Sequence, residues 1–123
     1  MDDELYQANI LDHYRNPRHH GALVTYTHRE EGKNPSCGDE LVVYLNIKDH
    51  VLIDATFEGE GCAISQASTS MLLERFVGQP VSSLLALSGR DLRALLGVPI
   101  GESREKCMML GLETLKAALT QYA

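Results

Sequence analysis

The sequence predicts an α+β fold, in which a small antiparallel β-sheet of about three strands has helices packed on one of its faces. Apolar residues in Leu41–Ile47 alternate with a period of two and are rich in strand formers. Val51–Phe57 has a similar composition and follows the tight connection Lys48–His50, so the two segments predict a β-hairpin. Segments with helical character lie before and after this hairpin, which favours an antiparallel sheet over alternating β-α units.

Helices are predicted over five segments: Asp2–Arg15, Cys62–Val77, Pro80–Leu87, a capping-box helix from Ser88 to Leu96, and Arg104–Gln121. Asn16-Pro17 ends the first, because a residue that precedes proline disfavours the helical conformation. Gly78 is well placed to cap the second helix at its C-terminus, and Ser103 to cap the last at its N-terminus.

The remaining stretches are polar or rich in glycine. Leu23–Tyr26 is predicted to add a short strand to the sheet, and Glu58–Gly61 is expected to end the second hairpin strand. The sequence shows neither an internal repeat nor a linker, so we expect one domain spanning residues 1–123.

Composition argues against two classes of partner. The net charge is −6 and the pI is near 5.3, whereas nucleic-acid binding needs clustered Lys and Arg. No apolar run is long enough to cross a membrane, and the acidic N-terminus is unlike a secretory signal, so we expect a cytoplasmic protein. A small basic group, Arg15, Arg18, His19 and His20, is either a docking patch or a solvated helix end.

The three cysteines are an odd number, and a reducing compartment keeps them as thiols, so a disulfide framework is not expected. Cys37 and Asp39 lie two residues apart before the first hairpin strand, where extended chain points both side chains the same way. Cys62 follows the second strand and should return close to them. Cys62 and Cys107 are each expected in the first turn of a helix, where the dipole favours a thiolate.

Three thiolates and one carboxylate form a tetrahedral set suited to zinc, or an open set suited to iron. The spacing alone leaves a second interpretation open, in which the thiols are buried and unrelated, because there is no Cys-x-x-Cys pair. A purely structural zinc site is a third interpretation. No glutamate beside a ligand is placed as a general base, so a zinc hydrolase is not predicted.

Four segments, spread over nearly the whole chain, match motifs of one known family. They are Ile10–Arg18 (ILDHYRNPR), Asn34–Asp39 (NPSCGD), Phe57–Ser65 (FEGEGCAIS) and Arg104–Cys107 (REKC). With these motifs the sequence resembles the NifU/IscU family of iron–sulfur cluster assembly proteins, and its SufU branch in particular.

The resemblance implies a NifU/IscU-like fold with Cys37, Asp39, Cys62 and Cys107 as metal ligands at one exposed end. In the SufU branch the site holds zinc, and a desulfurase histidine displaces one cysteine. That cysteine, here Cys37, then accepts persulfide sulfur from a SufS-like cysteine desulfurase. The protein would then be at most a zinc-dependent sulfurtransferase. In the scaffold branch, iron and sulfur form a [2Fe–2S] cluster that passes to apo-proteins.

Two features bear on the choice of branch. Lys106 stands where the IscU branch has histidine, and this residue together with the run Glu58–Cys62 favours SufU. Leu96–Ile100 stands in the neighbourhood where the IscU branch has its Leu-Pro-Pro-Val-Lys chaperone motif, so the resemblance does not extend to chaperone-driven release. SufU-like proteins, however, carry an insertion between the second and third cysteines, most of which this chain lacks. We expect Lys106 to stabilise the Cys107 thiolate and to form a salt bridge with Asp39 when no metal is bound.

Overall fold

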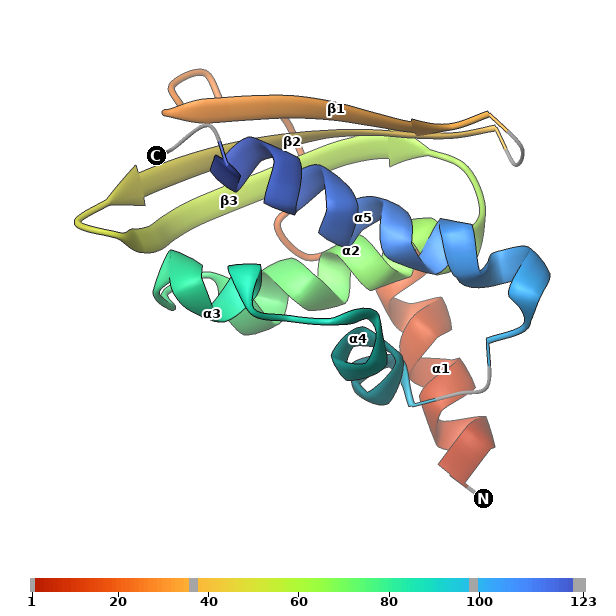
Figure 1. The fold of residues 1–123 in the computed structure, drawn as a ribbon. Helices are drawn as coiled ribbons and strands as arrows, with labels where there is room; N and C mark the ends of the chain where they lie inside the picture. Colours follow the sequence, from red (N-terminus) through yellow and green to blue (C-terminus); the bar gives the residue numbers. More distant parts are fainter. Residues whose placement is uncertain (1, 36–37, 98–99, 121–123) are drawn as a thin grey trace.

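The computed structural model describes residues 2–35, 38–97 and 100–120 and has a three-stranded antiparallel sheet with its helices on one face (Figure 1). This confirms the predicted fold class. The elements in chain order are α1 (Asp2–Arg15), β1 (His28–Asn34), β2 (Asp39–Lys48), β3 (Val51–Glu60), α2 (Ala63–Phe76), α3 (Val81–Leu85), α4 (Gly89–Leu96) and α5 (Glu102–Thr120).

The sheet has the order β1-β2-β3, so each strand pairs with its neighbour in sequence. The β2–β3 hairpin was predicted, and its alternation of apolar residues places Leu41, Val43 and Leu45 in the core. The outer edge of β3 is partly covered, because Phe57 exchanges backbone hydrogen bonds with His19 and Gly21. Covering an edge in this way protects it from pairing with another chain.

The third strand does not lie where the sequence predicted it. Leu23–Tyr26 is irregular, and β1 is formed instead by the polar segment His28–Asn34. The helices cover only one face of the sheet (Figure 1), so the side chains of this strand that point to the other face, such as Arg29 and Lys33, are exposed. Its strand conformation therefore comes from pairing with β2 rather than from apolar residues of its own.

The glycine-rich run Glu58–Gly61 was expected to end the sheet, but β3 continues through Glu60. Gly59 permits this because a Cβ there would lie 2.4 Å from the backbone oxygen of Glu40, so only glycine fits. In the ladder Glu60 pairs with Glu40, which brings the chain back level with the start of β2. The strand thus delivers Cys62 next to Asp39.

The predicted helices are all present, with small shifts at their ends. Cys62 is the N-cap of α2, and Gly78, with φ of +94°, follows its C-cap. The predicted capping box between Ser88 and Asp91 opens α4. Ser103 is not a cap, because α5 already begins at Glu102. The stretch Leu96–Ile100, which was compared with the chaperone motif of the IscU branch, includes residues 98–99, and these two lie outside the described residues.

The core lies between the sheet and the helices α2 and α5. It includes the fully buried side chains Phe57, Leu72, Leu112 and Leu115. α5 also makes two very close contacts through glycine. A Cβ at Gly32 of β1 would lie 2.0 Å from Thr114 Oγ1, and one at Gly111 of α5 would lie 2.2 Å from Thr69 Oγ1. These contacts fix the distance of α5 from both β1 and α2.

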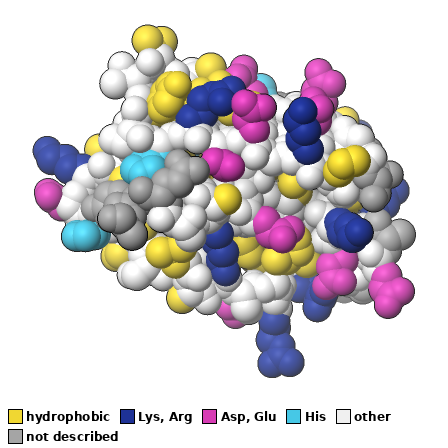
Figure 2. All heavy atoms as spheres, turned by 45° about the horizontal axis from the view of Figure 1, so that its top comes forward, with side chains coloured by type: hydrophobic (Ala, Val, Ile, Leu, Met, Phe, Trp, Pro, Cys, Tyr) yellow, Lys and Arg dark blue, Asp and Glu magenta, His cyan; other side chains and the backbone are white. Residues whose placement is uncertain are grey.

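On the face shown in Figure 2, acidic and basic side chains are interspersed rather than gathered into one large patch of a single sign. Within the described residues, no helix combines the length and the apolar character needed to cross a membrane.

Candidate metal centre

Three of the four predicted ligands meet in the structure. Asp39, Cys62 and Cys107 each offer one ligand atom, and these atoms all lie within 4.8 Å of one another. They come from the first residue of β2, the N-cap of α2 and the second turn of α5. Cys37 lies outside the described residues. In sequence it belongs to the connection of residues 35–38 that joins β1 to β2.

Asp39 is the most buried polar group of this cluster, at 1% exposure. Its Oδ1 accepts a 2.8 Å hydrogen bond from the backbone N–H of Cys62. Its Oδ2 is also buried, and no hydrogen-bond partner for it is found among the described residues. A buried carboxylate oxygen without a donor costs free energy, and a bound cation would satisfy it.

Gly61 holds the carboxylate in place. Its φ is +140°, and a Cβ at this position would lie 2.1 Å from Asp39 Oδ1. Glycine is therefore required twice, for the backbone conformation and for the close approach. The turn between β3 and α2 consequently packs directly against Asp39.

Cys62 is half-buried and carries the backbone N–H that binds Asp39. As N-cap it has extended backbone, with φ −71° and ψ 159°, and its side chain makes no capping hydrogen bond. The Cys62 sulfur therefore does not cap α2. It lies within 4.8 Å of the ligand atoms of Asp39 and Cys107.

Cys107 is fully buried and is the sixth residue of α5, so the prediction that it lies in the first turn was wrong. The helix begins two residues earlier than expected, which places Cys107 in its second turn. The side-chain amide of Asn34 donates a hydrogen bond to the Cys107 sulfur, with Nδ2 and Sγ 3.9 Å apart. The buried environment and this amide are what distinguish Cys107 from Cys62.

The expected salt bridge between Lys106 and Asp39 is not formed. Lys106 is exposed, and the ion pairs among the described residues do not include it. The neighbouring residue in the helix, Cys107, points into the core, so Lys106 projects in a different direction. Glu105 pairs with Arg93 of α4 on the exposed side of the same turn.

The donor set fits a thiophilic metal ion. Two thiolates and a carboxylate suit zinc or iron, and two sulfurs bound to one tetrahedral zinc lie about 3.8 Å apart. The ligand atoms of this cluster are close enough for that geometry after small adjustments. The unpartnered Oδ2 of Asp39 is the independent sign that a cation belongs here. A bound zinc would hold the thiols as thiolates.

A pocket of about 320 Å³ opens beside Gly61 at the end of α1. Its lining includes Tyr14, His20, Glu60 and Gln66. The pocket gives the surface next to the cluster a concave shape.

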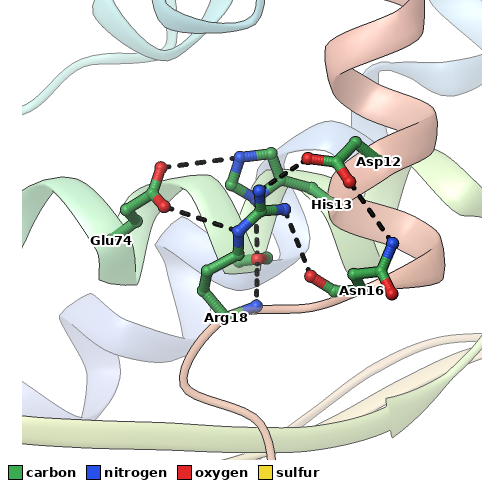
Figure 3. Close-up of polar contacts among 6 residues, drawn as sticks. Asp12, His13, Asn16, Arg18 and Glu74 are labelled. Atoms are coloured by element: carbon green, nitrogen blue, oxygen red, sulfur yellow. Dashed lines mark hydrogen bonds and ion pairs between the residues drawn. The ribbon is translucent and has the colours of Figure 1, made fainter.

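A second polar cluster joins α1 to α2 (Figure 3). The Ser70 hydroxyl accepts a hydrogen bond from the backbone N–H of Arg18 and lies 2.8 Å from His13 Nδ1. The Ser70 hydroxyl can donate its own hydrogen to His13 Nδ1, which matches a neutral imidazole that carries its proton on Nε2. Nε2 lies 3.6 Å from the Glu74 carboxylate. Burial, with the charge of Arg18 added, lowers the pKa of His13.

Arg18 is the centre of this cluster rather than part of a free basic patch. Its guanidinium lies 2.6 Å from Asp12 and 3.5 Å from Glu74. The hydrogen bond from Arg18 lowers the pKa of the Asp12 carboxyl. The basic group was interpreted as either a docking patch or a solvated helix end, and for Arg18 the structure shows neither, because its guanidinium is paired with carboxylates of α1 and α2.

The chain matches the family model described as the NifU-like N-terminal domain over residues 5–123. It belongs to that family. The resemblance to iron–sulfur cluster assembly proteins, which the sequence motifs indicated, is therefore confirmed.

Similar proteins include both branches of this family. The chain is 39% identical to the iron–sulfur cluster assembly scaffold protein IscU of Thermotoga maritima, over 97% of this chain and 95% of that protein. It is 33% identical to the zinc-dependent sulfurtransferase SufU of Bacillus subtilis, over 97% of this chain and 92% of that protein. Both alignments, over 135 and 136 residues, are longer than this 123-residue chain, so both relatives hold residues without a counterpart here.

Solved structures share the NifU-like fold. FiSufU from Fervidobacterium islandicum AW-1 superposes with a TM-score of 0.79 at 30% identity and covers 97% of this chain and 99% of that chain. A NifU-like N-terminal domain from Brucella abortus superposes with a TM-score of 0.81 at 23% identity and covers 97% of this chain and 94% of that chain. This likeness supports the fold alone.

Sequence reasoning did not single out Asn34, His13 or Ser70. The first two lie inside the quoted family motifs, but nothing in their spacing indicated a contact. Asn34 is 73 residues from Cys107, and Ser70 is 57 residues from His13, so only the tertiary structure brings these pairs together.

Proposed function

We propose that this NifU-like chain, a single domain, is a zinc-bound sulfur acceptor of the SufU type. Cys37, Asp39, Cys62 and Cys107 would bind the metal, and Cys37 would receive sulfur from a SufS-like cysteine desulfurase in the cytoplasm. The observation that carries the proposal is the buried Asp39 carboxylate, which has one oxygen without a partner and lies within 4.8 Å of two cysteine sulfurs.

The chemistry of transfer needs no external oxidant or reductant. The Cys37 thiolate attacks the outer sulfur of the desulfurase persulfide, and the sulfur–sulfur bond of that persulfide breaks. The desulfurase leaves as a thiolate, and Cys37 keeps the outer sulfur as a new persulfide. A bound zinc supplies charge that keeps the cysteines deprotonated before transfer.

The described part of the site supports a distinction between ligands that stay on the metal and one that leaves it. Asp39 and Cys107 are buried, and the contacts of Gly61 and Asn34 hold them, so they suit the part of fixed ligands. Cys37 belongs, in sequence, to the short connection between β1 and β2, and a ligand from a connection suits the part of one that leaves the metal. The pocket beside Gly61 offers room for a partner segment to approach.

The SufU assignment also rests on chemistry at the third cysteine. Lys106 cannot bind the metal as a cation, so the set stays at three cysteines and one aspartate. The similarity to the zinc-dependent sulfurtransferase SufU of B. subtilis supports this assignment.

Metal analysis together with a sulfur-transfer assay tests the proposal. The protein purified under native conditions should contain about one zinc per chain. After incubation with a desulfurase and L-cysteine, mass spectrometry should find one added sulfur atom on Cys37, and desulfurase turnover should rise. Cys37→Ser should abolish both effects, whereas the distant variant Ser88→Ala should keep them. Zinc binding without stimulation or added sulfur would contradict the acceptor role.

The alternative function is a scaffold on which a [2Fe–2S] cluster is assembled and passed to apo-proteins. The 39% identity to the T. maritima scaffold protein favours it. Anaerobic incubation with iron, L-cysteine and desulfurase would then yield a [2Fe–2S] chromophore that transfers to an apo-ferredoxin. If no cluster forms while zinc stays bound, the acceptor function is favoured.

A further inference from the structure

Asn34 is a buried amide at the edge of the candidate metal centre. It is the last residue of β1, pairs with Asp39 across the β1–β2 ladder and is 7% exposed. Directly paired residues point to the same face of a sheet, so Asn34 and Asp39 both face the helices. The two side chains therefore frame the site where the connection that carries Cys37 begins and ends.

The side-chain amide of Asn34 is directed at a ligand. Its Nδ2 donates to Sγ of Cys107 at 3.9 Å, a long contact of the kind that sulfur acceptors make. Burying an amide costs free energy unless its hydrogen-bonding groups are used, so an apolar residue would suit this position better if packing alone mattered. The donor also carries no charge and cannot titrate near neutral pH.

A hydrogen bond to a metal-bound thiolate has two effects. It orients the sulfur, and it draws electron density from it, which changes the strength and the energy of the metal–sulfur bond. It also makes the sulfur a weaker nucleophile. Of the two cysteines in the described cluster, Cys107 is the fully buried one that receives this bond, and Cys62 is half-buried.

We infer that Asn34 is a positioning residue whose amide holds the Cys107 sulfur as a permanent metal ligand and keeps it from acting as the sulfur acceptor. This inference rests on the proposed function, because it assumes that the site binds metal. It extends that function by stating why one thiol stays on the metal while another leaves it.

The test uses cobalt(II) as the probe, because cobalt bound to thiolates has a sulfur-to-metal charge-transfer band in the near ultraviolet. Asn34→Leu keeps the branching and the number of heavy atoms of the side chain but removes the donor. Loss of the hydrogen bond raises the energy of the sulfur electrons, so the band should move to longer wavelength. Affinity for zinc, measured by competition with a chelator, should fall about 10- to 100-fold.

Two further variants separate positioning from folding. Asn34→Ala should give the same band shift if Asn34→Leu fails to fold. Asn46→Ala removes an amide of the same sheet that donates to the Thr25 carbonyl, and it should leave band and affinity unchanged. Thermal unfolding of the metal-free proteins reports any loss of stability.

The outcomes separate a failure of the proposed metal site from a failure of the role inferred for Asn34. If the wild-type protein shows no charge-transfer band, the proposed metal site is wrong. If the wild type shows the band and the Asn34 variants leave its position and the zinc affinity unchanged, the role of Asn34 is wrong while the metal site stands. A lower unfolding temperature with an unshifted band would mean that Asn34 is only structural.

Discussion

The backbone N–H of Cys62 donates a 2.8 Å hydrogen bond to Oδ1 of Asp39, so one carboxylate joins the start of α2 to the start of β2. The other oxygen of the same carboxylate is buried without a partner among the described residues. Asp39 is therefore a structural group through one oxygen and a ligand candidate through the other. This double role decides what its substitution should do.

Asp39→Asn should have opposite effects on the metal-free and the metal-bound protein. The amide oxygen still accepts from Cys62, but the buried charge is removed, so the free energy of unfolding without metal should rise by about 1–3 kcal/mol. Zinc should then stabilise the variant much less than the wild type. Chemical denaturation with and without zinc measures both effects. A variant that loses stability without metal and keeps the full gain from zinc would contradict this account.

Gly61→Ala should damage the metal site in addition to straining the backbone. Its φ is +140°, and the new Cβ would meet Asp39 Oδ1 at 2.1 Å. The matched control is Gly21→Ala, with φ +126° and no atom within 4 Å of the added carbon. Both variants should lose about 1–3 kcal/mol of stability to backbone strain. Only Gly61→Ala should also weaken zinc binding, as a chelator titration would reveal; equal zinc affinities would argue against the close contact.

Gly111→Ala should destabilise the protein although alanine is the better helix former by about 1 kcal/mol. The added Cβ would lie 2.2 Å from Thr69 Oγ1, so α5 must move away from α2. The double variant Gly111→Ala, Thr69→Ala removes the nearest atom and should recover part of the loss. A double-mutant cycle of unfolding free energies measures this coupling. Additive effects would show that the two positions do not touch.

Stability should decline in mildly acidic solution because of His13. Its pKa is lowered from the ordinary 6.5 by burial and by Arg18, so near that pH the folded chain binds fewer protons than the unfolded chain. The free energy of unfolding therefore falls as the pH drops below about 6.5. Glu74 and Asp12 also face His13 and partly oppose this shift.

His13→Gln is the variant that checks the pH dependence. It cannot be protonated, so its loss of stability between about pH 7 and pH 5 should be smaller than in the wild type. The lowered pKa of Asp12 acts in a separate range, below its ordinary 3.8, and should affect both proteins alike. The same decline in both proteins would rule out His13 as the cause.

Sequence patterns predicted those parts of the fold in which local signals agree with tertiary ones. The alternation in β2 and the capping box at Ser88 are examples. β1 was missed because its residues are polar and its conformation depends on pairing with β2. The glycine-rich end of β3 predicted a break in the strand. Gly59 is instead needed for a close contact with Glu40, which the sequence spacing does not reveal.

The candidate ligands were predicted more completely than their surroundings. Asp39, Cys62 and Cys107 were named from the motifs, and the structure brings them together, while the placement of Cys37 stays a prediction. The contacts of Asn34 and Gly61 with these ligands could not be predicted, since they join residues that are far apart along the chain or depend on backbone geometry. The expected partner of Asp39, Lys106, instead projects from the exposed side of α5.

The two glycine contacts of α5 have a consequence for which sequences this fold tolerates. Gly32 and Gly111 are not themselves candidate ligands, yet they set how deeply the helix that carries Cys107 sits against β1 and α2. A single added methyl group at either position would shift Cys107 relative to Asp39. If the site binds metal as proposed, a substitution at either glycine could therefore leave the fold intact and still weaken metal binding.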